Sequence, residues 1–184
     1  MPRIAPITGK DDVPAEHHDV VDDVLSVFGR VRGPFSVLLH SPKLASKMLQ
    51  LVKFNRGETI VEPPLRSIAI LAAVREREAA YVWSAQVGAA RQAGLREEVI
   101  DLLREKGDVG ALPEEDERDI VTYVRQLARD NRVDYPVFNR LNERHGAQWL
   151  VELTVAANYY ALLSGVVNAF EVSVPPDGDR LPSA

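Results

Sequence analysis

The stretch "REREAAYVWSAQVGAARQAG", residues 75–94, gathers side chains that could do chemistry within a short distance along one helix. Tyr81, Trp83 and Gln86 fall within two turns, and Glu78 supplies a carboxylate just before them. The phenol, indole and amide all form hydrogen bonds, and Tyr81 becomes a useful acid only if a nearby cation lowers its pKa of about 10. We consider Gln86, Tyr81 and Glu78 as catalytic candidates. Core packing of the two aromatic rings and a helix-start role for Glu78 are the alternatives.

Helical spacing places Ala79, Val82 and Gln86 on one face, with Trp83 at its edge. Small residues beside a single amide could leave a cleft, so Ala79, Val82 and Trp83 are candidate substrate contacts. In the alternative interpretation, alanine only allows close helix packing, and Gln86 bonds to a backbone carbonyl. Gln86 is therefore the residue on which the two interpretations differ.

The elements that must position these residues are helices, because the apolar spacing is helical nearly everywhere and no period-2 strand is evident. Residues 63–76 are apolar nearly all round and are expected to form the central core helix, with a bend near 77–79. Gly29 and Gly146 are expected to end helices. The sequence predicts an all-α fold and one domain over residues 1–184, with an irregular arm at 1–12 and an irregular tail at 175–184.

Composition excludes several classes of function. The chain has 184 residues, 46% hydrophobic and 27% charged residues, no cysteine, and a net charge of −5. The negative balance argues against a nucleic-acid or anionic-membrane partner, and the absence of cysteine removes thiolate chemistry. No signal peptide is evident, and no run reaches the ~18 to 20 apolar residues of a membrane span. We therefore expect a cytoplasmic protein. The histidines and carboxylates show no converging spacing, so no metal is expected.

Five segments in order along the chain resemble the carboxymuconolactone decarboxylase family, which includes the alkylhydroperoxidase D-like proteins. They are "PRIAPIT", "RGPFSVLLHSPKLA", "PPLRSIAIL", "YVWSAQ" followed by "ARQAGL", and "NYYALLSGVVNAFEV". The resemblance implies an all-α fold assembled as a dimer, trimer or hexamer, with the pocket near the subunit interface. The apolar character of residues 147–172 independently favours burial against a second copy, and hence a homo-oligomer.

Redox members of this family carry two cysteines and a histidine on one helix, and a glutamate on the preceding helix. Laid onto this sequence, those positions hold Ala79 and Val82, then Gln86, and then Ser67. A thiol peroxidase is excluded because no thiolate can form. Decarboxylase members usually keep the histidine and the glutamate, so the usual proton-transfer pair is also replaced.

Three further residues could bind a substrate. The resemblance places Ser67 at the former glutamate position and His40 in a characteristic loop segment. Arg66, on the central helix, could hold a substrate carboxylate through its planar fork, or could form an ordinary salt bridge. His40 could equally be a structural hydrogen-bonding residue.

Two functions of different classes follow. The first is a cofactor-free decarboxylase or lyase, in which Gln86, Tyr81 or an arginine stabilises the enolate formed from a small organic acid or lactone. The second is a catalytically silent ligand-binding or structural homo-oligomer, favoured by the simultaneous replacements at the family's reactive positions. A structure separates them by showing a polar pocket at Gln86 or a region filled by Trp83 and apolar neighbours.

Overall fold

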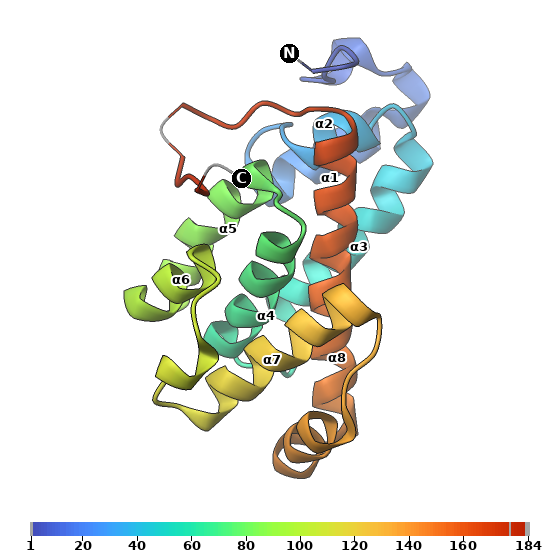
Figure 1. Cartoon of the computed structure of the whole chain (residues 1–184). Helices are drawn as coiled ribbons and strands as arrows, with labels where there is room; N and C mark the ends of the chain where they lie inside the picture. Colours follow the sequence, from blue (N-terminus) through green and yellow to red (C-terminus); the bar gives the residue numbers. More distant parts are fainter. Residues whose placement is uncertain (1, 177, 183–184) are drawn as a thin grey trace. The chain divides into compact units, whose positions relative to one another are not determined.

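A computed structural model describes residues 2–176 and 178–182 (Figure 1). The described residues form eight α-helices and three short 3-10 helices, and no strand occurs among them. The α-helices are α1 (His18–Phe28), α2 (Pro34–Leu38), α3 (Pro42–Gly57), α4 (Pro63–Glu76), α5 (Ala80–Gln92), α6 (Glu97–Arg104), α7 (Glu115–Asp130) and α8 (Tyr135–Ala169). The 3-10 helices are η1 (Lys10–Asp12), η2 (Ala15–His17) and η3 (Val109–Ala111). The all-α prediction is confirmed.

Contacts between residues divide the chain into two compact units. One comprises the chain up to Thr59 together with Gly165–Ser173, and the other comprises Ile60–Ser164 with the tail from Val174. We call them the first and second units and describe each by itself. The expectation of a single domain over residues 1–184 stays a prediction.

In the first unit, α1 packs against α3, and α2 also packs against α3. The α1 helix ends at Gly29, whose φ of 72° is accessible to glycine at little cost, as the sequence predicted. The helix begins at His18, directly after the 3-10 helix η2, which Pro14 precedes. The arm, expected to be irregular, contains the single 3-10 turn η1.

In the second unit, α4 is the central helix. It packs against α5, α6 and α7, the helices coloured green to yellow in Figure 1. Every residue from Ile68 to Val74 is buried, so the helix is enclosed on all sides, as its all-round apolar sequence predicted. The proline pair at its start suits the first helical turn, where a backbone N–H would have no partner.

The long helix α8 contains a break at Gly146, which has φ 83° and ψ 166°. This conformation is almost confined to glycine, and it separates the short helix that the sequence predicted from the long apolar one after it. By length and composition alone α8 could cross a membrane, although half of its most apolar window is buried inside the protein. The core helix of a soluble protein meets the same criterion, and the expectation of no membrane partner stays a prediction.

Candidate functional site

The segment that carries the catalytic candidates begins at the turn between α4 and α5. The chain reverses at Glu78, which has a left-handed φ of 50°. Backbone hydrogen bonds close the turn, from Glu78 N to Arg75 O at 3.1 Å and from Ala79 N to Val74 O at 3.2 Å. The predicted bend near 77–79 is thus present, and Ala79 caps the start of α5.

Arg75 anchors this turn from within the buried end of α4. Arg75 is only 8% exposed, and its Nε donates a hydrogen bond to the backbone oxygen of Arg104 at 2.7 Å. Its Nη1 donates to Glu78 Oε2. A buried guanidinium costs free energy unless its donors are satisfied, and here they tie the end of α6 to the turn. Arg75 was not among the residues predicted from the sequence.

Both carboxylate oxygens of Glu78 are occupied by cations. Besides Arg75 on Oε2, the Lys106 ammonium donates to Oε1 at 2.5 Å. The hydrogen bond from Lys106 is the main cause that lowers the pKa of Glu78, and the charges of Arg75 and Lys106 act in the same direction. Glu78 is therefore held as a carboxylate, which is unsuited to donating a proton near neutral pH.

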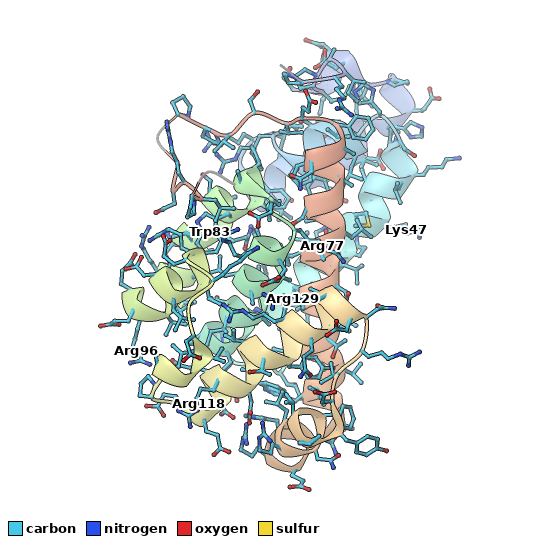
Figure 2. All side chains as sticks on the ribbon, in the orientation of Figure 1. Lys47, Arg77, Trp83, Arg96, Arg118 and Arg129 are labelled. Atoms are coloured by element: carbon cyan, nitrogen blue, oxygen red, sulfur yellow. The ribbon has the colours of Figure 1, made fainter. Side chains whose placement is uncertain are left out.

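The inward face of α5 is filled with side chains. Ala79 and Trp83 are fully buried and Val82 nearly so. The Cζ atom of Arg104 lies 5.9 Å from the centre of the Trp83 ring, within the range of a cation–π contact. The Trp83 Nε1–H is buried and has no hydrogen-bond partner among the described residues. Trp83, labelled in Figure 2, thus acts in this structure as a packing residue of the second unit.

Gln86 and Tyr81 differ in their surroundings. Gln86 is half-buried, and its amide makes no hydrogen bond within residues 2–176 and 178–182. Tyr81 is buried. The hydrogen bond from Gln86 to a backbone carbonyl, which the packing alternative predicted, is thus not formed among the described residues, and the amide is able to bind water or a ligand.

The remaining substrate-binding candidates contact backbone oxygens. Ser67 Oγ donates to Pro63 O at 2.8 Å, and Arg66 Nη1 donates to Val61 O at 3.1 Å. Burial lowers the pKa of Arg66, and the Coulombic interaction with Tyr160 opposes that shift. His40 belongs to the first unit, where its Nε2 lies 2.9 Å from Ala5 O. Both the serine and the histidine therefore have structural partners.

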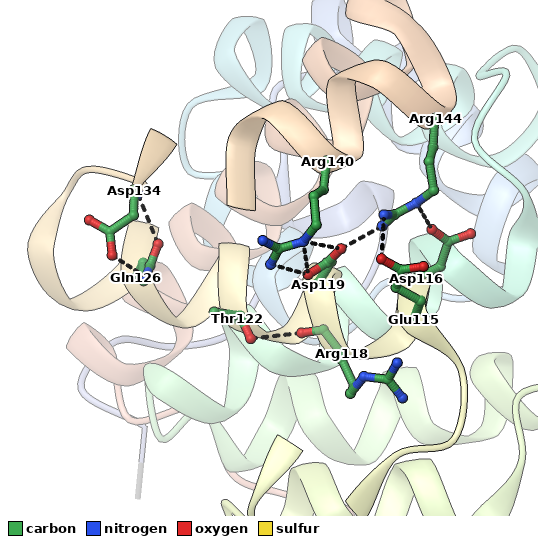
Figure 3. A network of polar contacts seen from close by, with 9 residues as sticks. All are labelled: Glu115, Asp116, Arg118, Asp119, Thr122, Gln126, Asp134, Arg140 and Arg144. Carbon is green, nitrogen blue, oxygen red and sulfur yellow. Dashed lines mark hydrogen bonds and ion pairs between the residues drawn. The ribbon is translucent and has the colours of Figure 1, made fainter. Parts of the chain in front are cut away.

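A second polar cluster lies where the start of α7 meets the first part of α8. Asp119, almost fully buried, accepts hydrogen bonds from Arg140 Nη2 and Arg144 Nη2, both at 2.6 Å (Figure 3). Burial alone would raise the pKa of Asp119, but the two arginines outweigh it and hold the pKa below its usual value. Arg144 also donates to Asp116 Oδ1 at 2.8 Å.

His145 joins the same cluster. Its Nε2 lies 3.0 Å from Asp116 Oδ1, and its ring stacks on Trp149 with centroids 3.9 Å apart. Trp149 in turn donates from Nε1 to Glu62 Oε2 at 2.7 Å. His145 lies directly before the break at Gly146 and has a carboxylate and an aromatic ring as partners.

Two hollows open on the second unit, and neither is lined by α5. One, of about 290 Å³, is lined largely by acidic residues at the start of α7; its lining is Leu65, Glu114, Glu115, Asp116, Glu117 and Arg144. The other, of about 250 Å³, is mostly apolar; its lining is Tyr123, Phe138, Asn142, Ala147, Leu150, Val151, Thr154 and Val155. We call the first the acidic hollow and the second the apolar hollow.

The residues that organise these regions are only weakly marked in the sequence. Arg75 was detectable as a charge within an apolar helix, since such a charge needs a partner. Lys106 and Asp119 gave no signal, because their partners lie 28 and at least 21 residues away along the chain. No group of three or more histidine, cysteine or carboxylate side chains among the described residues is arranged to hold a metal ion.

Comparisons by sequence find no matching family model and no matching curated protein. Solved structures do match. An AhpD-core alkylhydroperoxidase structure, an uncharacterised peroxidase-related protein from Ralstonia eutropha JMP134, has a TM-score of 0.72 at 14% identity and covers 95% of each chain. A protein of unknown function from Agrobacterium tumefaciens, described as a candidate AhpD antioxidant defence protein, has a TM-score of 0.66 at 17% identity; the match covers 79% of this chain and 100% of that one.

These identities are low, so the likeness concerns the fold rather than the activity. The neighbours nevertheless agree with the resemblance carried by the sequence segments, at the level of the helical architecture. No thiolate is available in the present chain, since it contains no cysteine. The chain therefore has the alkylhydroperoxidase D-like helical fold, in a form that lacks cysteine.

Proposed function

We propose that this protein is a catalytically silent, cysteine-free member of the carboxymuconolactone decarboxylase family that acts as a ligand-binding or structural homo-oligomer. The observation that carries the proposal is that the inward face of α5 is packed with buried side chains. Ala79, Val82 and Trp83 occupy or flank the family's reactive positions and are buried as core. Packing of this kind stabilises the unit, and none of these three side chains can transfer a proton near neutral pH.

The polar candidates around α5 support the same proposal. A cofactor-free decarboxylase needs a group that donates a proton to the enolate, in a site that excludes water. The pKa of Glu78 is lowered by its cations, and the Gln86 amide does not titrate near neutral pH. Acid catalysis would therefore have to come from Tyr81, whose pKa would need to fall well below about 10.

One observation favours the other function. The half-buried amide of Gln86 has no hydrogen-bond partner in the described structure, so it could orient the carboxylate of a small organic acid or the carbonyl of a lactone. A cofactor-free decarboxylase or lyase acting on such a compound is accordingly the second candidate. The same amide would serve a ligand-binding protein without any turnover.

A homo-oligomer is part of the proposal. The second part of α8 exposes Val151, Val155 and Leu162, which are between 40% and 61% exposed. Their spacing of four and seven residues places them along one side of the helix. Two of them, Val151 and Val155, also line the apolar hollow. Contiguous apolar surface of this kind is typical of a protein interface.

Turnover assays test the catalytic part. Purified protein is incubated with γ-carboxylated lactones and β-keto acids, and carbon dioxide release is measured for wild type, Gln86→Ala and Gln86→His. We expect no release above the uncatalysed rate from any of the three. Release by wild type that Gln86→Ala abolishes would establish the decarboxylase instead. Calorimetric titration with the same acids then separates ligand binding from a purely structural role.

Light scattering coupled to size-exclusion chromatography tests the assembly. The double variant Val155→Asp/Leu162→Asp is expected to have a smaller mass than wild type, because charge would be buried in the contact. Ala89→Asp/Gln92→Asp, at exposed positions of α5, is the matched control and should keep the wild-type mass. A monomeric wild type at the concentrations found in the cell would overturn the homo-oligomer.

A further inference from the structure

The outward side of α3 combines exposed apolar and basic residues. Leu44 and Leu51 are 49% and 38% exposed, and Lys43 and Lys47 are exposed beside them. Spacings of three, four and seven residues put all four on one side of the helix (Lys47 is labelled in Figure 2). The α3 helix has no acidic residue, although the chain as a whole is acidic. We call these four residues the basic ridge.

The two lysines of the basic ridge differ from the other cations of α3 in lacking partners. Lys53 lies 3.6 Å from Asp23, and Arg56 donates to Val27 O at 3.0 Å while lying over the Phe28 ring. Lys43 and Lys47 make no hydrogen bond or ion pair with the described part of the chain. A basic amphipathic helix face of this type is characteristic of a surface that meets an acidic partner.

The acidic hollow of the second unit has complementary chemistry. Its inner carboxylates have partners, since Glu117 accepts from Arg96 at 2.7 Å and Asp116 accepts from Arg144. Its outer carboxylates are available, because Glu115 is 59% exposed with one contact of 3.2 Å to Arg144. The exposed Glu114 side chain forms no ion pair among the residues described. Leu65 adds an apolar part to the lining.

We propose that the basic ridge of one copy docks on the acidic hollow of a second copy. The inference rests on the homo-oligomer of the proposed function and names one of its contacts. Lys43 and Lys47 would meet Glu114 and Glu115, while the leucines of the ridge cover the apolar lining of the hollow. A second copy is the occupant because each chain carries both complementary surfaces.

Such a contact is head-to-tail, since two different surfaces meet. Head-to-tail contacts form a ring when the rotation between copies closes, whereas contacts of one surface with itself form two-fold pairs. The exposed side of α8 is suited to the second kind of contact. Because the ridge contact involves partly exposed charges, added salt weakens it.

Site-specific crosslinking tests the pairing, and the absence of cysteine makes every introduced thiol unique. Lys47→Cys and Glu114→Cys chains are co-expressed with different tags and treated with a short bis-maleimide. A crosslinked dimer is expected from the co-expressed pair and not from either variant alone. Gln92→Cys co-expressed with Glu114→Cys is the matched control and should remain uncrosslinked. A dimer formed by Lys47→Cys alone would show that the ridge meets itself and would overturn the proposal.

Charge reversal gives an independent test. Lys43→Glu/Lys47→Glu and Glu114→Lys/Glu115→Lys are each expected to lower the oligomer mass measured by light scattering, whereas Lys43→Arg/Lys47→Arg keeps it. Co-expressing the two reversed variants should restore the mass lost by each. The acidic ridge of the first variant is complementary to the basic hollow of the second, and the second keeps a basic ridge for the unchanged hollow of the first.

The results distinguish failure of the contact between ridge and hollow from failure of the homo-oligomer. A wild type that is oligomeric and keeps its mass in both reversed variants overturns this contact but leaves the homo-oligomer intact. A monomeric wild type overturns both. If the masses stay constant while wild type, but not Lys43→Glu/Lys47→Glu, sediments with phosphatidylglycerol vesicles, the ridge binds an anionic membrane surface and the proposal is wrong.

Discussion

Helices α5 and α8 both carry large apolar and aromatic side chains and bury many of them, but α8 also leaves several of them exposed. The α5 helix, whose sequence resembles an active-site segment, buries Trp83 and Val87 completely and Val82 nearly so. The α8 helix, whose sequence resembles a core helix, leaves Val151 and Leu162 at least half exposed. The aromatic content of a helix alone therefore does not indicate a functional site. What distinguishes the two helices is whether their large side chains have neighbours within the chain.

The largest expected effect is on α5. Trp83→Ala should lower the free energy of unfolding by about 3–5 kcal/mol, because it leaves a cavity in a closed core. Trp83→Phe is the matched control and should cost much less, since it keeps an aromatic ring and removes a buried N–H that lacks a partner in the described structure. Chemical denaturation monitored by circular dichroism measures both. A loss below 1 kcal/mol in the alanine variant would contradict the core role.

The next effect concerns the ion cluster that holds the first part of α8. Asp119→Asn should lower stability at neutral pH by about 2 kcal/mol, because Arg140 and Arg144 lose a charged acceptor. The folded-state pKa of Asp119 is depressed, so its contribution is present above the unfolded pKa of about 4 and is lost as pH falls through the lower folded value. Urea titrations between pH 7 and pH 2.5 should therefore show wild type and variant converging in acid. Parallel curves would contradict the linkage.

A smaller effect is expected at the turn before α5. Glu78→Gln weakens the contacts to Arg75 and Lys106, but the carboxylate is 45% exposed, so the loss of stability should stay within about 1 kcal/mol. The pKa of Glu78 is also lowered, so its contribution disappears in acid in the same sense as that of Asp119. Lys106→Gln is the companion variant, and similar losses in the two single variants and the double variant would show that they act as a pair. A loss as large as that of Trp83→Ala would mean that the turn, rather than the core, controls the stability of this region.

The smallest effect on stability is expected on the exposed side of α8. Leu162→Ser should change the unfolding free energy of the separated subunit by no more than about 0.5 kcal/mol, because the side chain has few neighbours within its own chain. Denaturation at a protein concentration low enough to dissociate the oligomer measures this. A loss of several kcal/mol there would show that Leu162 belongs to the subunit core and would remove the contrast with α5.

The sequence was most informative about local features. The all-round apolar character of 63–76 predicted the buried α4, and Gly29 and Gly146 predicted the places where helices end or break. The bend before α5 was also predicted. These features depend on residues within a few positions of one another, and backbone preference and helical period are expressed at that range.

The charged contacts were not predictable in the same way. Glu78 was considered as a catalytic carboxylate or a helix-start residue, and it instead joins Arg75 and Lys106. Asp119 on α7 accepts hydrogen bonds from Arg140 and Arg144, which lie on the next helix, α8. The sequence contains many carboxylates and arginines in similar local contexts. Which of them form ion pairs depends on how the helices pack. For α8, the apolar character of residues 147–172 predicted a surface for a second copy, but it did not indicate which side chains of the helix are exposed.

The two glycines of α8 are expected to differ in how they tolerate mutation, because only one of them lies at the break. At Gly146 the backbone conformation, φ 83° and ψ 166°, is one that side chains with a Cβ atom rarely adopt. At Gly165 the backbone is helical, and a Cβ atom would meet nothing within 4 Å of the described chain. Alanine at 165 could even strengthen the helix. Natural variation in related chains should therefore be narrow at the first glycine and broad at the second, unless a neighbouring subunit needs the close approach that a missing side chain allows.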